Sequence, residues 1–83
     1  MNVRLHPHAL QRITERGATE SEVVATVLGG ERFPAKHGRA GFRRHFAFDG
    51  EWLGRVFGSK QVLAYAEPVP DGWLVITVIV KYF

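Results

Sequence analysis

The chain contains no cysteine among its 83 residues. This absence excludes a disulfide framework, a thiolate metal site and a cysteine nucleophile. The remaining nitrogen ligands are four histidines: His6, His8, His37 and His45. Their spacing matches no compact four-ligand zinc pattern, so we expect neither a bound metal ion nor a cofactor.

Phosphate-binding loops and serine-nucleophile motifs are also missing. Gly29-Gly30 and the glycines Gly38 and Gly41 match neither a Walker A loop nor a dinucleotide-binding fingerprint. No nucleophile elbow surrounds Ser21 or Ser59. The sequence therefore disfavours a nucleotide-dependent enzyme and a serine hydrolase.

No stretch has the character of a signal peptide or a membrane-spanning helix. Residues Met1 to His6 lack an apolar core, and the apolar run at the other end is too short to cross a bilayer as a helix. A chain of 83 residues has room for one hydrophobic core. We therefore expect residues 1–83 to form a single soluble, cytoplasmic domain.

Acidic residues are in the minority, with eight Asp and Glu against eleven Lys and Arg, for a net charge of +3. Positive charge is concentrated between Arg32 and Arg55, where the only acids are Asp49 and Glu51. Such a segment suits an anionic partner, either RNA or an acidic protein. A solvated hairpin kept soluble by its arginines would have the same composition, so that alternative stays open.

The last eleven residues, Trp73 to Phe83, are a nearly unbroken run of β-branched and aromatic residues, typical of a strand. Regular alternation would place Leu74, Ile76, Val78, Val80 and Tyr82 on one face, which we expect to lie under helices. The other face would carry Trp73, Val75, Thr77, Ile79, Lys81 and Phe83. This second face has polar groups, so we expect it to be partly open. A strand of this length could extend past the sheet and pair with a second copy or a partner.

Two helices are predicted before the strands. Pro7 suits a first helical position and Gly17 a left-handed cap, so the first helix should cover Pro7 to Arg16. Thr19 to Glu22 has the pattern of a capping box, which begins a second helix that should end at Gly29-Gly30. Its expected inward residues are Val23, Val24, Val27 and Leu28.

The rest of the chain predicts an antiparallel meander. An edge strand near Arg32 to Lys36 should precede a strand over Phe42 to Phe48. Asp49-Gly50 is a strong hairpin signal, so Glu51 to Phe57 should return antiparallel, followed by a strand over Lys60 to Glu67 and a turn over Pro68 to Gly72. The predicted fold is α+β, with two N-terminal helices packed on a twisted antiparallel sheet.

One candidate site is a basic stripe on the first helix. His8, Arg12 and Arg16 are spaced four residues apart and should share one side of the helix. An imidazole can exchange a proton near neutral pH, and guanidinium groups can hold phosphate oxygens. Those are the components of metal-free RNA cleavage. Solvated arginines that pair with neighbouring glutamates would have the same spacing, so the structural interpretation stays open.

A second candidate site is the open face of the sheet. Thr77 and Lys81 should meet Arg43 and His45 there if the strand register places them on one side. Arg43, His45, Arg44 and Lys60 are the expected RNA-binding residues, because cations that hold phosphates give salt-dependent affinity. An ordinary exposed sheet face would have a similar pattern.

Three segments carry a resemblance to a known family: His8-Ala-Leu-Gln-Arg12-Ile-Thr-Glu-Arg16-Gly17-Ala-Thr19, Phe57-Gly-Ser-Lys60 and Val75 to Tyr82. Together they resemble a family of small bacterial domains of unknown function, which is similar to the toxin ribonuclease superfamily of RelE, ParE, BrnT and barnase. The resemblance implies two helices on a twisted antiparallel sheet. By motif position it implies six catalytic residues: His8, Arg12, Arg16, Thr77, Lys81 and Tyr82.

The resemblance and the residue patterns together predict a metal-independent endoribonuclease of the RelE-like toxin type, or a degenerate relative of one. Some members of that superfamily act by binding and not by catalysis. The alternative is therefore a non-catalytic module that binds an acidic, antitoxin-like protein. RNA, such a protein and a second copy of the chain are the expected partners.

Overall fold

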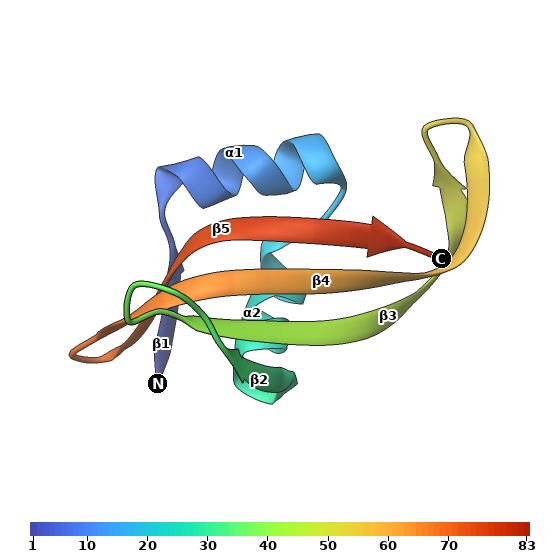
Figure 1. Ribbon diagram of the computed structural model, residues 1–83. Coiled ribbons are helices and arrows are strands. Elements are labelled where there is room, and N and C mark those ends of the chain that lie inside the picture. Colours follow the sequence, from blue (N-terminus) through green and yellow to red (C-terminus); the bar gives the residue numbers. More distant parts are fainter.

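Two helices cover one face of a five-stranded sheet in the computed structural model, which describes residues 1–83 (Figure 1). The elements are β1 (Asn2–Leu5), α1 (Pro7–Arg16), α2 (Glu20–Gly29), β2 (Glu31–Pro34), β3 (Ala40–Trp52), β4 (Arg55–Val69) and β5 (Gly72–Tyr82). The strand order is β1-β5-β4-β3-β2. The predicted α+β fold is confirmed. The sheet is mixed and not wholly antiparallel, because β1 pairs in parallel with β5.

Local capping groups determine where both helices begin and end. Gly17 closes α1 in the left-handed conformation with φ of 80°, and its N–H donates to the Ile13 carbonyl at 3.0 Å. The Thr19 hydroxyl accepts from the Glu22 N–H at 3.1 Å, and the Glu22 carboxylate accepts from the Thr19 N–H at 3.0 Å. The predicted bounds of α1 and the predicted capping box of α2 are confirmed.

The inward face of α2 differs from the prediction at Val24, which is only half-buried, and at Leu28. Val23 and Val27 are buried as expected, and Thr26 is buried beside them with its hydroxyl donating to the Glu22 carbonyl at 2.7 Å. Leu28 is 57% exposed. At 3.6 residues per turn the buried stripe passes through positions 23, 26 and 27, which rotates Leu28 toward solvent.

The hairpin between β3 and β4 turns four residues later than predicted. Asp49-Gly50 lies inside β3 at a register shift, with Asp49 at φ of 46°. The turn is Leu53-Gly54, with both residues at positive φ and with Trp52 paired to Arg55 across it. Asp-Gly supplies a left-handed residue to a β-bulge as readily as to a turn, so the local sequence does not distinguish the two.

A second bulge changes which residues of β5 face the helices. Tyr65 pairs with Thr77 and Ala66 pairs with Val75, so Ile76 is an extra residue without a partner on β4. Trp73 and Val75 therefore join Val78, Val80 and Tyr82 on the helix side, where Val75 and Val78 are fully buried. The predicted alternation holds from Thr77 to the end of the strand and is wrong before Ile76, because a bulge inverts the faces.

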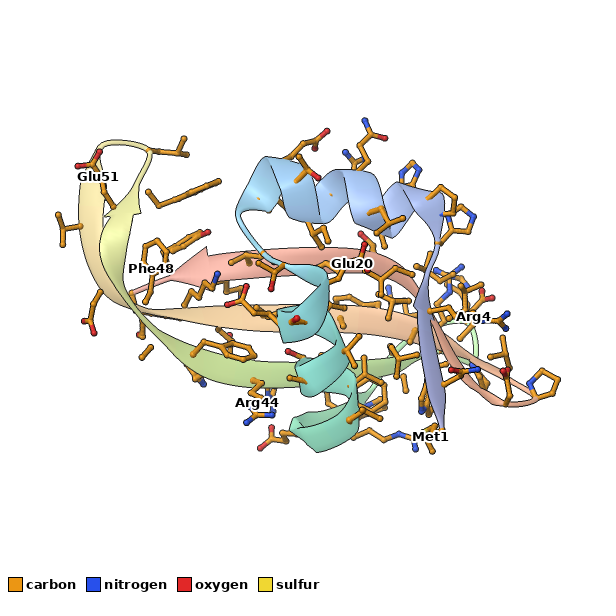
Figure 2. The ribbon with its side chains drawn as sticks, turned by 180° about the vertical axis from the view of Figure 1, so that it is seen from behind. Met1, Arg4, Glu20, Arg44, Phe48 and Glu51 are labelled. Atoms are coloured by element: carbon orange, nitrogen blue, oxygen red, sulfur yellow. The ribbon has the colours of Figure 1, made fainter.

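The helices and the core lie on one side of the sheet. Figure 2 shows this side, with the helices in front of the strands. Small side chains of β4, Ala64 and Ala66, are fully buried beneath Val23 of α2 and Ala9 of α1. The opposite face of the sheet carries no helix and is the face toward the viewer in Figure 1. No helix of the chain combines the length and the apolar character needed to cross a membrane.

Candidate functional site

The basic stripe of α1 forms only in part. The Nε2 atom of His8 lies 3.4 Å from a guanidinium nitrogen of Arg12, and Arg12 pairs with Glu15 at 3.1 Å. Both contacts are at the surface of the helix, so the imidazole and one guanidinium are accessible together. Arg16, the third member, has a different environment.

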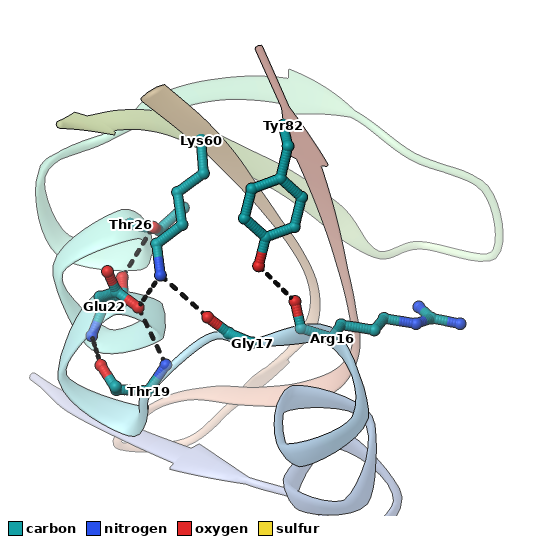
Figure 3. Close-up of polar contacts among 7 residues, drawn as sticks. All are labelled: Arg16, Gly17, Thr19, Glu22, Thr26, Lys60 and Tyr82. Carbon is teal, nitrogen blue, oxygen red and sulfur yellow. Dashed lines mark hydrogen bonds and ion pairs between the residues drawn. The ribbon is translucent and has the colours of Figure 1, made fainter. Parts of the chain in front are cut away.

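Arg16 and Tyr82 join the C-terminal end of α1 to β5 (Figure 3). The Arg16 guanidinium donates to the Val78 carbonyl at 2.5 Å, and the Tyr82 hydroxyl donates to the Arg16 carbonyl at 2.8 Å. Burial raises the pKa of Tyr82, and the nearby Glu22 carboxylate raises it further. Their polar groups are therefore committed to holding the helix end, which has carbonyl oxygens without partners inside the helix.

Lys60 is buried on the helix side, 6% exposed, and is not on the open face. Its Nζ atom donates at 2.9 Å to the Gly17 carbonyl and at 2.9 Å to the Glu22 carboxylate (Figure 3). A cation at the C-terminal end of a helix is stabilised by the helix dipole. The expected role of Lys60 as a contact to RNA phosphates is therefore corrected, because its ammonium group is enclosed and has both its partners within the fold.

An aromatic cluster covers the same region. The ring of Trp52 stacks on the ring of Tyr82 with centroids 5.2 Å apart, and Phe48 and Phe57 also contact Tyr82. A β-carbon at Gly17 would lie 2.4 Å from the Tyr82 hydroxyl oxygen and 2.7 Å from the Trp52 ring. The hairpin that carries Phe48 and Glu51 bends toward this end of α1, so the cluster is structural (Figure 2).

Arg44 also lies on the helix side. Its guanidinium donates to the Ala25 carbonyl of α2 at 3.2 Å, and Figure 2 shows it beside that helix. Arg43 and Arg44 therefore occupy opposite faces of the sheet, as alternation on β3 requires. The four expected RNA-binding residues therefore lie on different sides of the sheet. Arg43 and His45 are on the open face, and Arg44 and Lys60 are on the helix side.

The strand register places the other candidate residues of the sheet together on its open face. Gly41, Tyr65 and Thr77 form one row across β3, β4 and β5. Arg43, Leu63 and Ile79 form the next row, and His45, Gln61 and Lys81 form the third. Strands in a sheet are about 4.8 Å apart, so His45 and Lys81 stand roughly 10 Å from each other. Arg43, His45, Thr77 and Lys81 thus share one surface.

The charges on this face are mostly positive. Arg43 donates to the Glu31 carboxylate at 2.6 Å, and Arg39 donates to Glu67 at 3.1 Å. Lys81 forms no ion pair, and the His45 ring lies beside the Phe83 ring with centroids 5.9 Å apart. Both acids are paired, so the row that contains His45 and Lys81 offers a free ammonium and an exposed imidazole.

Sequence reasoning missed a pocket at the end of the open face. It has a volume of about 410 Å³ and is lined by Phe33, Pro34, Ala35, Lys36, His37, Arg39, Tyr65 and Thr77. The loop between β2 and β3 crosses in front of the sheet to form its wall (Figure 1). Lys36 and His37 were part of the basic middle segment, but sequence alone could not show that their loop folds back over Tyr65.

The predicted catalytic set does not assemble into one cluster. Arg16 and Tyr82 are joined by a hydrogen bond on the helix side, whereas Thr77 and Lys81 lie on the open face. No group of three or more His, Cys, Asp or Glu side chains is arranged to hold a metal ion.

No protein-family model, curated protein or solved structure matches the chain. The fold and site define an α+β protein with helices on one face of its sheet and a basic surface on the other.

Proposed function

We propose that this protein binds RNA on the open face of its sheet and is a metal-independent endoribonuclease of the RelE-like toxin type, or a degenerate relative, acting in the cytoplasm. The observation that supports this most is the row of His45, Gln61 and Lys81 beside Arg43. It combines cations for phosphates with an imidazole on one accessible surface.

Single-stranded RNA suits such a surface better than a duplex does. Unstacked bases bind to aromatic side chains exposed on a sheet, while neighbouring cations hold the backbone. The open face has Phe83 beside His45 at one end and an edge-to-face pair of Phe33 and Tyr65 at the other. Arg43 and Lys81 lie between these aromatic groups.

The proposed reaction needs a base near a ribose and a cation near its phosphate. His45 takes the proton of the 2′-hydroxyl, the 2′-oxygen attacks phosphorus, and the bond to the 5′-oxygen breaks with a water supplying its proton. Lys81 stabilises the charge that builds on the phosphorane. His8 beside Arg12 is the other candidate base, on the surface of α1.

The test is cleavage of a mixed single-stranded RNA in EDTA by the wild type and by His45→Ala, Lys81→Ala and His8→Ala. Loss of the general base should reduce the rate on the order of 100-fold. Arg55→Ala is the control, because Arg55 is an exposed cation on the hairpin away from the proposed site. Cleavage that EDTA abolishes, or that survives in both histidine variants, contradicts the proposal.

A specific observation favours the second function, a non-catalytic module that binds an acidic antitoxin-like protein or a second copy of the chain. β1 pairs only with Gly72 to Val75, so the outer edge of β5 has no strand partner from Ile76 to Tyr82, where the Val78 carbonyl accepts from Arg16. Unpaired strand edges accept a strand from another chain. A solution mass of one chain at every concentration, with no acidic protein co-purified, would contradict this alternative.

A further inference from the structure

The pocket under the loop between β2 and β3 has walls suited to an aromatic ring. The Phe33 ring covers Gly41, where a β-carbon would come within 2.2 Å of the ring. Its ring meets Tyr65 edge to face at 5.8 Å between centroids. Gly41 is therefore the residue that lets Phe33 lie against the sheet and leave a cavity bounded by Phe33, Pro34 and Tyr65.

The rim of this pocket carries positive charge in a defined geometry. His37 and Gly38 both have positive φ, 62° and 71°, and the Arg39 N–H donates to the Lys36 carbonyl at 3.2 Å. These features form a tight turn of the kind that needs two left-handed residues. A non-glycine residue at positive φ is uncommon, and histidine adopts this conformation more readily than most side chains do. The turn presents Lys36 and His37 to solvent at the mouth of the pocket.

The pocket also has unused hydrogen-bonding groups. The Thr77 hydroxyl on the floor and the Tyr65 hydroxyl make no side-chain hydrogen bond, while Arg39 is paired with Glu67. Lys36 forms no ion pair. Ligand pockets of this size combine apolar walls with a few convergent polar groups. An anion at the rim, a flat ring against the aromatic and proline walls and a hydroxyl partner describe a nucleotide.

We propose that this pocket binds one nucleotide unit of the RNA that occupies the open face, with the base against Phe33 and Tyr65 and the phosphate at Lys36 and His37. The inference rests on the proposed function, since Thr77 lies one row from Arg43 and two rows from Lys81 along the same surface. The pocket is then the subsite for the nucleotide at one end of the bound strand.

The experiment titrates the four nucleoside 5′-monophosphates, and inorganic phosphate separately, into the 15N-labelled protein. We expect amide shifts at Lys36 to Arg39, Tyr65 and Thr77 with a monophosphate, and weaker binding of phosphate alone. Lys36→Gln should weaken the affinity about tenfold, because a charged hydrogen bond is lost. Gly41→Ala should weaken it too, by displacing Phe33. Arg55→Gln is the matched surface control and should bind as the wild type does.

A short single-stranded RNA is then added to the monophosphate complex and should displace the monophosphate. Absence of shifts at the pocket, shifts equal with inorganic phosphate alone, or failure of RNA to displace the monophosphate would each overturn the inference. These results do not depend on cleavage. A pocket that binds while the EDTA assay shows no cleavage leaves the subsite standing and rejects the nuclease, and the reverse result rejects only the subsite.

Discussion

Lys60 is the only charged residue with a buried side chain, and it holds three parts of the molecule together. Its ammonium group joins β4 to the end of α1 through the Gly17 carbonyl and to the start of α2 through Glu22. The same carboxylate completes the capping box. A buried ion that loses its partner is strongly destabilising, so this residue makes the helix pair depend on the sheet.

Glu22→Gln tests this dependence. Glutamine can still complete the capping box, whereas the variant leaves Lys60 without a negative partner. We expect the free energy of unfolding to fall by about 2 kcal/mol, below the range for a fully buried pair because Glu22 is partly exposed. Urea unfolding followed by circular dichroism measures it. Glu20→Gln, an exposed acid in the first turn of the same helix, is the control, and equal losses in the two variants would contradict the ion-pair account.

The raised pKa of Tyr82 predicts a loss of stability in alkaline solution. Burial first, and Glu22 second, raise the pKa of Tyr82 above its ordinary value of 10.0. The folded state therefore keeps the phenol proton at a pH where the unfolded chain releases it. Stability from this group is complete below pH 10 and declines as the pH rises further, through the raised folded pKa.

The measurement is the urea midpoint between pH 8 and pH 11 for the wild type and for Tyr82→Phe. The variant should lose about 1 kcal/mol at pH 8, because the Arg16 carbonyl loses its donor. It should also show a shallower alkaline decline than the wild type. An unchanged slope would mean that other groups cause the decline.

At the scale of elements, the hairpin between β3 and β4 contains a residue unsuited to its turn. Leu53 has φ of 52°, an unfavourable backbone conformation for leucine, and its side chain is 84% exposed. No burial of the side chain therefore offsets the cost of the backbone conformation. Two-residue hairpin turns of this kind favour Asn before Gly. Leu53→Asn should raise stability by about 1 kcal/mol, which corresponds to roughly 4–8 °C in the unfolding midpoint of a domain this small.

Thermal unfolding of Leu53→Asn beside Val56→Asn provides the comparison. Val56 is also exposed, but it lies in β4 and does not form the turn. Asparagine is unfavourable in strands, so Val56→Asn should be neutral or destabilising. A gain in both variants would indicate a general benefit of polarity, and would contradict the turn argument.

At the scale of the whole molecule, the fold divides the cations between two surfaces. Neighbours in sequence separate, since Arg43 faces the open side and Arg44 bonds to α2. If RNA lies on the open face, Arg43→Gln should weaken binding and lower the slope of log K against log salt by about 0.7. Arg44→Gln removes the same charge from the other side and should leave the slope unchanged.

Fluorescence anisotropy with labelled single-stranded RNA between 50 and 200 mM salt, a range of roughly fourfold over which such affinities change strongly, measures both variants. Equal effects of the two substitutions would indicate general electrostatic attraction by the whole chain. An effect of Arg44→Gln alone would move the binding surface to the helix side and contradict the proposed interface.

The sequence by itself determined the features that depend on neighbouring residues. Pro7, Gly17 and the capping box of Thr19 and Glu22 determine the helix bounds, because a cap is satisfied by groups within four residues of it. Alternation likewise placed Arg43 with His45 on one side of β3. These predictions needed no knowledge of what packs against them.

The tertiary structure decided what depends on pairing between distant segments. Asp49-Gly50 favours a left-handed residue in either a turn or a bulge, and only the pairing of β3 with β4 selects the bulge. The bulge at Ile76 exists only relative to β4, and it determines which half of β5 faces the core. Lys60 is a surface cation by composition and becomes a buried one because the end of α1 leaves carbonyl oxygens above it. Register and long-range contacts are properties of two segments at once, so a pattern read along one segment cannot contain them.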